Sequence, residues 1–337
     1  MELKFHPYNL ELKNTFTISH GSRDVQPTLI VSLSDRGFTG YGEATATSYY
    51  GVTIEKMQAD ILNIEDLIAE NILLEPEELW ELTYPHLKEN PFALCALDMA
   101  MHDLHGKRNL QPLYQLWGLD LKNIPLTNYT IGIDSIEKMV QKIKEFPWPL
   151  YKIKLGTQDD VAIVRELRKH TNSIFRVDAN AAWTVDQAIE NAKALKELNV
   201  EFLEQPLKAN DWEGMEKLYK ESVLPLIADE SCIEESDVEK CAGYFHGINI
   251  KLTKCGGLTP GKRMILKGRS LGLKVMVGCM TESSVGISAI AQLTPQLDYV
   301  DMDGAMLLKH DIAKGIEILE DGKLVFPTLG GSGVTLL

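Results

Sequence analysis

Two patterns of apolar residues follow each other in the first third of the chain. Apolar and polar positions alternate in LKFHPYNLEL and TLIVSLSD, which is typical of strands, and turn signals lie at residues 35–37 and at Thr39-Gly40. Residues 53–117 instead carry apolar side chains at helical spacing, and residues 92–104 form a strongly apolar helix. Strands followed by helices predict an α+β unit.

A repeating pattern begins near Ile124. Short apolar runs alternate there with amphipathic segments such as VAIVRELRKH and AIENAKALKEL. The runs are IPLTNYTI, LYKIKL, IFRVDAN, VEFLEQP, PLIADE, GINIKL, LKVMVGCM and LDYVDMD. Eight strands separated by single helices predict a (β/α) barrel of the α/β class, with the preceding α+β unit as a separate capping domain.

Polar side chains stand at the ends of these apolar runs. They recur every 22 to 28 residues and are Lys154, Asp178, Glu204, Asp229, Lys251, Cys279 and Asp301. The carboxyl ends of all strands of such a barrel meet at one face, where active sites lie. These residues are therefore expected to converge on one pocket.

Three carboxylates in this series end consecutive strands: Asp178, Glu204 and Asp229. Carboxylates sharing one cleft raise each other's pKa, and a hard divalent cation removes that conflict. A set of oxygen ligands without His or Cys favours Mg²⁺ over Zn²⁺. One Mg²⁺ per subunit is expected, because helix capping would explain one of the three acids but not the set.

Lysines supply the candidate acid and base groups. Lys152 and Lys154 are two residues apart in LYKIKL and share a strand face, whereas Lys251 should approach from the opposite side of the ring. Lysine at its ordinary pKa of about 10.4 is no base, and we expect neighbouring cations to lower that pKa. Ion pairing with the carboxylates is the alternative. Lys254 is expected to support these groups indirectly or to be solvated.

Further candidates lie after the last two apolar runs. Asp301 and Asp303 in YVDMDG share a strand face, and paired carboxylates attract a substrate cation such as an ammonium. A hydrogen-bond network or a helix cap is the alternative. Cys279 and Glu282, in GCMTESS, are candidate substrate contacts at the end of the seventh strand, although Glu282 is equally interpreted as a helix cap.

Composition excludes several other functions. A net charge of −14 disfavours nucleic-acid binding. The chain contains no run of about 18 apolar residues, so we expect no membrane span. The five cysteines are scattered without a CxxC pair, which favours free thiols in a reducing compartment. The start MELKFHPYNLELK has no apolar signal core. We expect a cytoplasmic enzyme, and whether it forms a homo-oligomer stays open.

As an ordered set, these motifs resemble the enolase superfamily, muconate lactonizing enzyme subgroup. The motifs are KIK at 152–154, VDAN at 177–180, EQP at 204–206, ADES at 228–231 and NIK at 249–251. The segments HDLHGKRNLQPLYQLWG and GYGEA are similar too, so the resemblance covers nearly the whole chain. It implies a modified (β/α)₇β barrel at residues 121–312 and an α+β capping domain at 1–120, completed by the tail 313–337.

The resemblance also implies roles for the candidate residues. Mg²⁺ would be bound by the three carboxylates, while Lys154 and Lys251 would be the acid/base pair on opposite faces of the substrate, with Lys152 supporting Lys154. Asp301-Met302-Asp303 resembles the DxD of dipeptide epimerases, whose carboxylates hold the N-terminal ammonium of the peptide. Thr130 matches a substrate-contacting threonine of that group. Members that use a His-Asp pair are disfavoured by Lys251.

The expected function is Mg²⁺-dependent epimerisation of L-Ala-Xaa dipeptides, with proton exchange through an enediolate at an acidic or hydrophobic second residue. The alternatives are an N-succinylamino acid racemase, an o-succinylbenzoate synthase, a cycloisomerase, or a non-catalytic metal-binding barrel. Arg23, in SHGSRD, either pairs with a glutamate side chain of the substrate or is solvated. Tyr49 and Tyr50 either favour an apolar side chain or pack between the domains.

Overall fold

A three-stranded antiparallel sheet forms the N-terminal part of the computed structural model, which describes residues 1–18 and 21–337. Its strands, in order across the sheet, are β1 (Glu2–Ile18), β2 (Gly21–Asp35) and β3 (Phe38–Thr45). The turn at 36–37 is confirmed, with positive φ at both residues. The turn predicted at Thr39-Gly40 is wrong, because these residues continue β3 and pair with Ser34 and Leu33.

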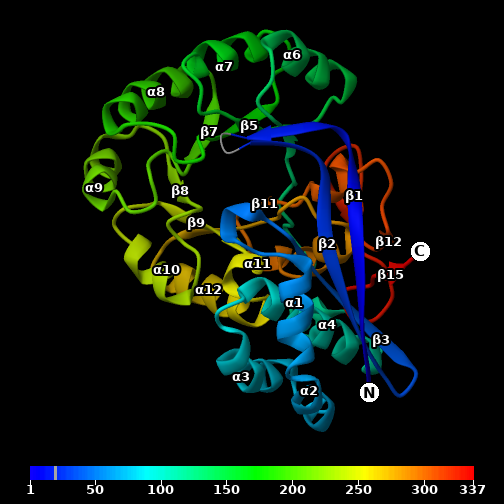
Figure 1. Ribbon diagram of the computed structural model, residues 1–337. Helices are drawn as coiled ribbons and strands as arrows, with labels where there is room; N and C mark the ends of the chain where they lie inside the picture. Colours follow the sequence, from blue (N-terminus) through cyan, green and yellow to red (C-terminus); the bar gives the residue numbers. More distant parts are fainter. Residues whose placement is uncertain (19–20) are drawn as a thin grey trace.

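Helices follow the sheet and pack beside it (Figure 1). They are η1 (Ser48–Tyr50), α1 (Ile54–Leu62), α2 (Glu65–Asn71), α3 (Pro76–Leu87), α4 (Pro91–Arg108) and α5 (Leu113–Leu116). The apolar helix α4 lies directly on β3. A Cβ atom at Gly42 would lie 2.0 Å from the carbonyl oxygen of Ala96, and one at Gly40 would lie 2.3 Å from that of Ala100. The absence of side chains at these two glycines therefore permits the close approach of helix and strand.

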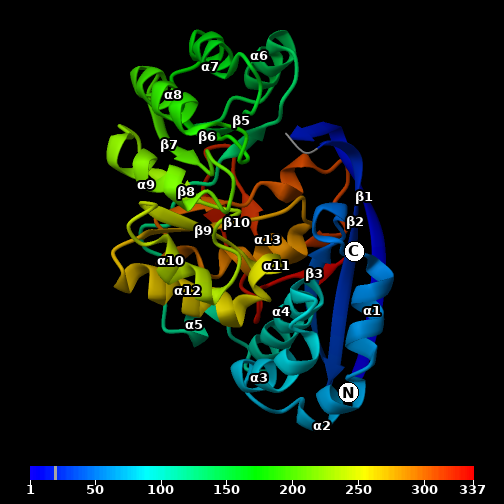
Figure 2. The same ribbon diagram turned by 60° about the vertical axis from the view of Figure 1, so that its left-hand side comes forward.

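Eight parallel strands form the second part, in sequence order around the sheet. They are β4 (Tyr129–Ile131), β5 (Leu150–Lys154), β6 (Ile174–Asp178), β7 (Val200–Glu204), β8 (Leu226–Ala228), β9 (Gly247–Lys251), β10 (Lys274–Gly278) and β11 (Tyr299–Asp301). A bridge between Thr127 and Val300 brings the segment before β4 next to β11, so the sheet is a nearly closed barrel (Figure 2).

Helices connect successive strands and surround the barrel (Figure 1). They are α6 (Ile136–Glu145), α7 (Asp160–Arg168), α8 (Val185–Glu197), α9 (Trp212–Glu221), α10 (Glu235–Cys241), α11 (Leu252–Cys255) with α12 (Leu258–Ser270), and α13 (Ser284–Ala291) with η2 (Thr294–Gln296). The last strand is followed by the short 3₁₀ helix η3 (Gly304–Leu307). This arrangement confirms the predicted modified (β/α)₇β barrel with an α+β unit. None of the helices in the described part of the chain is long and apolar enough to cross a membrane.

The C-terminal tail forms two short antiparallel pairs. They are β12 (Ala313–Lys314) with β15 (Thr335–Leu336), and β13 (Glu317–Ile318) with β14 (Leu324–Val325). Ala313 and Val334 pack in one buried cluster with Ile30 of β2 and Val285 of α13, so the tail contacts both the sheet and the barrel. The domain limits at residues 120 and 312 stay predictions.

A buried carboxylate joins the sheet to the barrel. Glu43 of β3 accepts hydrogen bonds from the backbone nitrogens of Ser283 (3.1 Å) and Gly286 (2.9 Å) and from the Ser283 hydroxyl (2.6 Å). These N–H groups belong to the first turn of α13, where an anion is favoured by the helix dipole. Burial nevertheless raises the pKa of Glu43, against these hydrogen bonds.

We predict that Gly42→Ala destabilises the protein, because the added methyl group must push α4 away from β3. Overpacking of this kind costs about 1–3 kcal/mol, measured as the free energy of unfolding in urea. Thr39→Ser on the same strand is the control, since it keeps the hydroxyl that contacts Ser34. Equal stability of the two variants would contradict this account of the packing.

Candidate active site

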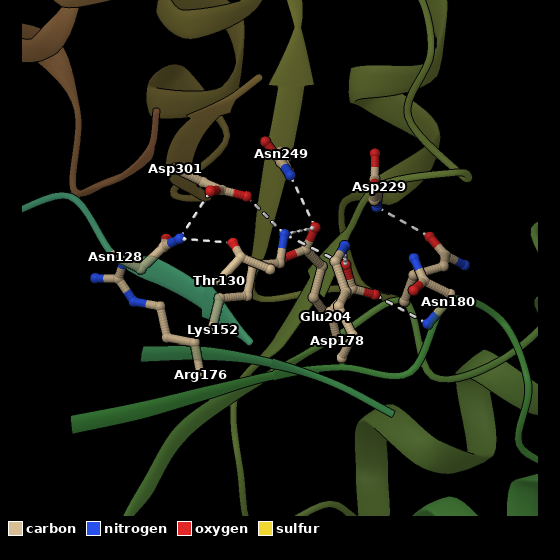
Figure 3. Close-up of polar contacts among 12 residues, drawn as sticks. Asn128, Thr130, Lys152, Arg176, Asp178, Asn180, Glu204, Asp229, Asn249 and Asp301 are labelled. Atoms are coloured by element: carbon tan, nitrogen blue, oxygen red, sulfur yellow. Dashed lines mark hydrogen bonds and ion pairs between the residues drawn. The ribbon is translucent and has the colours of Figure 1, made fainter. Parts of the chain in front are cut away.

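The charged residues that were predicted to end the strands do meet at one end of the barrel, and Figure 3 shows Asp178, Glu204, Asp229 and Asp301 among them. Lys154, Asp178, Glu204 and Lys251 are the last residues of β5, β6, β7 and β9, and Asp229 directly follows β8. The three carboxylate side chains are fully buried. The barrel register therefore places groups from distant parts of the sequence around one space.

Carboxylate oxygens of Asp178, Glu204 and Asp229 lie within 4.8 Å of one another, close enough to share one ion. Burial, together with the charges of Asp178 and Asp229, raises the pKa of Glu204 to about 7, against the attraction of Lys152. The amide of Asn249 orients Glu204 by donating a hydrogen bond of 2.8 Å. The three carboxylates converge, and their negative charges repel one another. A hard divalent cation such as Mg²⁺ would neutralise this charge and fits these oxygen ligands.

Lys152 occupies the centre of this charge network (Figure 3). Its Nζ donates to Glu204 at 2.9 Å and to Asp301 at 2.8 Å, and it lies 3.3 Å from Asp178. Burial lowers the pKa of Lys152, but these carboxylates outweigh burial and hold the pKa well above its ordinary value. Lys152 is therefore a fixed cation, as in the ion-pair alternative, and connects the three-carboxylate cluster to Asp301.

Lys154 and Lys251 lie on opposite sides of the barrel, since β5 and β9 are four strands apart among eight. Lys154 donates to Asp178 at 2.6 Å, and Lys251 donates to Asp229 at 2.7 Å. Burial lowers the pKa of Lys251, but the attraction of Asp229 outweighs it and keeps this pKa above its ordinary value. At Lys251, the carboxylate of Asp229 thus outweighs the lowering of the pKa by the neighbouring Lys152.

Lys254 is buried and donates to the second oxygen of Asp229 at 2.6 Å. It is therefore not solvated, and its ammonium lies 5.7 Å from the centre of the Tyr50 ring. Although burial raises the pKa of Asp229, the two lysines at its oxygens hold this pKa well below the ordinary value. A turn directly after β9, formed by α11, brings Lys254 back to the site.

Asp301 and Asp303 come together, but not as predicted. Asp301 ends β11, whereas Asp303 lies beyond the strand as the residue that caps η3, so the shared strand face is wrong. Asp301 accepts from the amide of Asn128 at 2.8 Å, and Asp303 accepts from the backbone nitrogen of Thr130 at 2.5 Å. Thr130 lies in the middle of β4 rather than at its end. Cys279 lies beside both acids, within 4.8 Å.

The pKa values of the two acids are shifted in opposite directions. Burial and then the charge of Asp301 raise the pKa of Asp303 to about 7. Burial also disfavours ionised Asp301, but Lys152 outweighs burial and lowers the pKa of Asp301 to about 2. Among residues 1–18 and 21–337, Asp301 forms an ion pair with Lys152, whereas Lys152 only weakly offsets the shift at Asp303 and no ion pair to Asp303 is found.

A cavity of about 270 Å³ lies at this end of the barrel, and its lining does not include Lys152 or the three-carboxylate cluster of Asp178, Glu204 and Asp229. The sequence-predicted residues that line it are Arg23, Tyr49, Tyr50, Thr130, Lys154, Lys251, Cys279, Asp301 and Asp303. Sequence reasoning missed other lining residues, among them Phe16, Ile18, Asn180, Glu230, Met280 and Leu307. The ADES motif contained a usable signal for Glu230, whose pKa is raised to about 7 by burial and by the adjacent Asp229.

Glu282 does not reach the cavity. It lies beyond the end of β10, is buried, and accepts a hydrogen bond from the backbone nitrogen of Met280 at 2.9 Å. Burial and the neighbouring Glu43 raise the pKa of Glu282 to about 8. The expected substrate contact therefore finds no support in the geometry, because the chain turns toward α13 before this residue.

The candidates from the capping part line the cavity opposite the barrel. Arg23, on β2, donates a hydrogen bond to Gln26 and is partly buried, so it is not simply solvated. The Tyr50 ring packs against Phe92, with ring centres 5.6 Å apart, while Tyr49 is 57% exposed. Tyr50 thus packs within the capping part while it also lines the cavity, and the expected roles of Arg23, Tyr49 and Tyr50 stay predictions.

Comparisons with known proteins agree with this geometry. The L-Ala-D/L-amino acid epimerase of Maribacter sp. is 62% identical over all of this chain and 99% of its own, and that of Flavobacterium johnsoniae is 57% identical over both whole chains. The dipeptide epimerase of Enterococcus faecalis, solved with Mg and L-Leu-L-Tyr, superposes with a TM-score of 0.91 at 30% identity, covering 99% of both chains.

Family models match both parts of the chain. Residues 2–118 match the mandelate racemase / muconate lactonizing enzyme N-terminal domain, and residues 135–337 match the enolase C-terminal domain-like model. Together with the relatives, these matches confirm the resemblance found in the motifs. The chain belongs to the mandelate racemase / muconate lactonizing enzyme family of the enolase superfamily.

Proposed function

We propose that this protein is a Mg²⁺-dependent dipeptide epimerase that inverts the configuration of the C-terminal residue. The placement of Lys154 and Lys251 carries the proposal, because they face one cavity from opposite sides of the barrel. A carbon atom between them can lose a proton on one face and gain one on the other. The names of two relatives at 62% and 57% identity, both L-Ala-D/L-amino acid epimerases, support the same reaction.

Mg²⁺ would be held by Asp178, Glu204 and Asp229. When bound, it supplies a Lewis acid for the substrate carboxylate. Lys152 places a second positive charge beside the same carboxylates, where it stabilises negative charge that builds up as the α-proton leaves. The charge arrangement therefore favours reactions that begin with loss of a proton next to a carboxylate.

The proton is exchanged by the two opposed lysines. In each turnover one lysine must be neutral and accept the α-proton, while the other must be protonated and donate on the opposite face. Against the effect of burial, Asp229 raises the pKa of Lys251, and Mg²⁺ held by the same carboxylate would offset this effect of Asp229. Asp178 and Asp229 orient the two ammonium groups through hydrogen bonds of 2.6 Å and 2.7 Å. Reversing the two roles converts the opposite stereoisomer, so both directions use the same residues.

Asp301 and Asp303 would bind the amino end of the substrate. Asp301 already pairs with Lys152, so Asp303 is the acid whose charge an ammonium would stabilise. An N-acylated amino acid carries no such cation and would leave Asp303 buried without one. A free dipeptide therefore fits this site better than the substrate of an N-succinylamino acid racemase.

The two lysines give the sharpest test. Lys154→Ala and Lys251→Ala should each abolish epimerisation, because the base contributes about 10²–10⁴-fold, yet each should still exchange the α-hydrogen of one stereoisomer. Deuterium incorporation from D₂O, followed by mass spectrometry, measures this exchange. The exposed Lys122→Ala serves as the control. Exchange of the same isomer by both variants would refute the two-base assignment.

Substrate class is tested at the amino end. Asp303→Asn should lower kcat/KM for L-Ala dipeptides by at least about 30-fold, because a buried charge pair is worth roughly 2–5 kcal/mol. N-acetylated analogues should react poorly with both proteins. Asp120→Asn, at an exposed aspartate, is the matched control. If N-acyl amino acids react faster than dipeptides, the racemase alternative replaces this proposal.

Metal dependence is tested by binding as well as by activity. Chelation should abolish turnover and Mg²⁺ should restore it. Mg²⁺ should also raise the melting temperature of the wild type, since a ligand of the folded state stabilises it. Glu204→Gln should weaken Mg²⁺ binding in calorimetry, whereas the exposed Glu190→Gln should not. Unchanged Mg²⁺ affinity in Glu204→Gln would exclude this carboxylate as a ligand.

A further inference from the structure

Two apolar side chains close the main cavity on the side of Asp303. Phe16 of β1 and Leu307, the last residue of η3, line both the cavity of about 270 Å³ and a second cavity of about 20 Å³ beyond it. Thr130 also lines both cavities, and its backbone nitrogen donates a hydrogen bond to Asp303. These three residues therefore form the partition between the two spaces, next to the carboxylate that is expected to meet the ammonium.

The partition is held by the backbone around it. The nitrogen of Ile133, in the loop after β4, donates to the carbonyl of Thr17 at 3.0 Å. On the other side, Leu12 of β1 forms a bridge with Leu308, which directly follows η3. Both contacts fix the backbone on either side of Phe16 and so hold its Cα atom beside the cavity.

We propose that Phe16 and Leu307 restrict the first residue of the substrate to a small side chain such as that of alanine. This inference rests on the proposed function, in which Asp301 and Asp303 hold the ammonium. The carbon that bears the ammonium also bears the first side chain, which therefore lies against the walls nearest Asp303. A longer side chain would overlap the Phe16 ring, because packed side chains held by the backbone yield little.

The smaller cavity behind the partition is positively charged on one side. Lys13 and Lys142 line it. Lys13 donates to the carbonyl of Met306 at 2.9 Å, and Lys142 reaches Asp134 only at 3.4 Å. Removing the Phe16 ring joins the two cavities and brings these ammonium groups within reach of a longer first side chain. An acidic side chain then gains a charge-assisted partner, and a basic one is repelled.

The test compares dipeptides that differ only in their first residue. L-Ala, L-Leu, L-Glu and L-Lys are each joined to one second residue that the wild type epimerises, and kcat/KM is measured for each. The wild type should prefer Ala to Leu by at least about tenfold. Phe16→Ala should reduce this preference by about tenfold or more, mainly through a lower KM for Leu, and should favour Glu over Lys.

Three further variants make the result specific. Met280→Ala, which enlarges the main cavity at a residue outside the second one, should leave the ratio of Ala to Leu unchanged. Lys142→Met added to Phe16→Ala should remove the preference for Glu over Lys but keep the gain for Leu. Leu307→Ala replaces Phe16→Ala if circular dichroism shows that the latter is unfolded.

Two outcomes would overturn the inference alone: equal use of Ala and Leu by the wild type, or an unchanged ratio in the folded Phe16 and Leu307 variants. A ratio changed as much by Met280→Ala would also count against it, since the effect would then follow cavity size in general. A wild type that inverts no dipeptide overturns the proposed function together with this inference.

Discussion

Balancing buried charge at the mouth of the barrel is the constraint on which the rest of the structure depends. Asp178, Glu204, Asp229, Asp301 and Asp303 are all buried there, and the lysines around them are buried or nearly so. Isolated charges in such surroundings are strongly unfavourable, so a buried charge needs a partner or becomes neutral. The barrel supplies most of these partners because several strands end in a charged residue at the same place, while Asp303 stays without an ion pair in the described residues.

The same network joins the two ends of the proposed substrate site. Lys152 contacts Glu204, which belongs to the three-carboxylate cluster, and Asp301, which belongs to the pair at the amino end. Any change in charge at one end therefore alters how strongly Lys152 is attracted to the other. The metal cluster and the amino-end pair are thus parts of one electrostatic unit, and substitutions at either end are not independent.

The residues whose positions depend on strand periodicity were predicted well from the sequence. Lys154, Asp178, Glu204 and Lys251 each close a parallel strand, and a strand's position in the barrel fixes where its last side chain goes. The residues beyond short strands were placed less well. Asp303 turns into η3 and Glu282 turns toward α13, because loop geometry rather than strand period decides their direction.

Tertiary partners that do not lie at strand ends were not predictable from the sequence. Nothing near Glu43 indicates that its partner Ser283 lies 240 residues away, and Lys254 reaches Asp229 only through the turn after β9. The same holds for Phe16, which reads as an ordinary strand residue. Its place beside the cavity depends on how the end of β1 lies over the loop after β4.

The bond between Glu43 and α13 limits how the site can open. Swinging the whole sheet away from the barrel would strip this buried acid of its donors from Ser283 and Gly286 at once. Breaking these charge-assisted hydrogen bonds together, along with the buried packing around them, is unfavourable for a motion repeated in every catalytic cycle. Substrate entry therefore requires local movement of short segments beside the cavity and not of the whole sheet. The rate of turnover then does not depend on breaking the contact between the cap and the barrel.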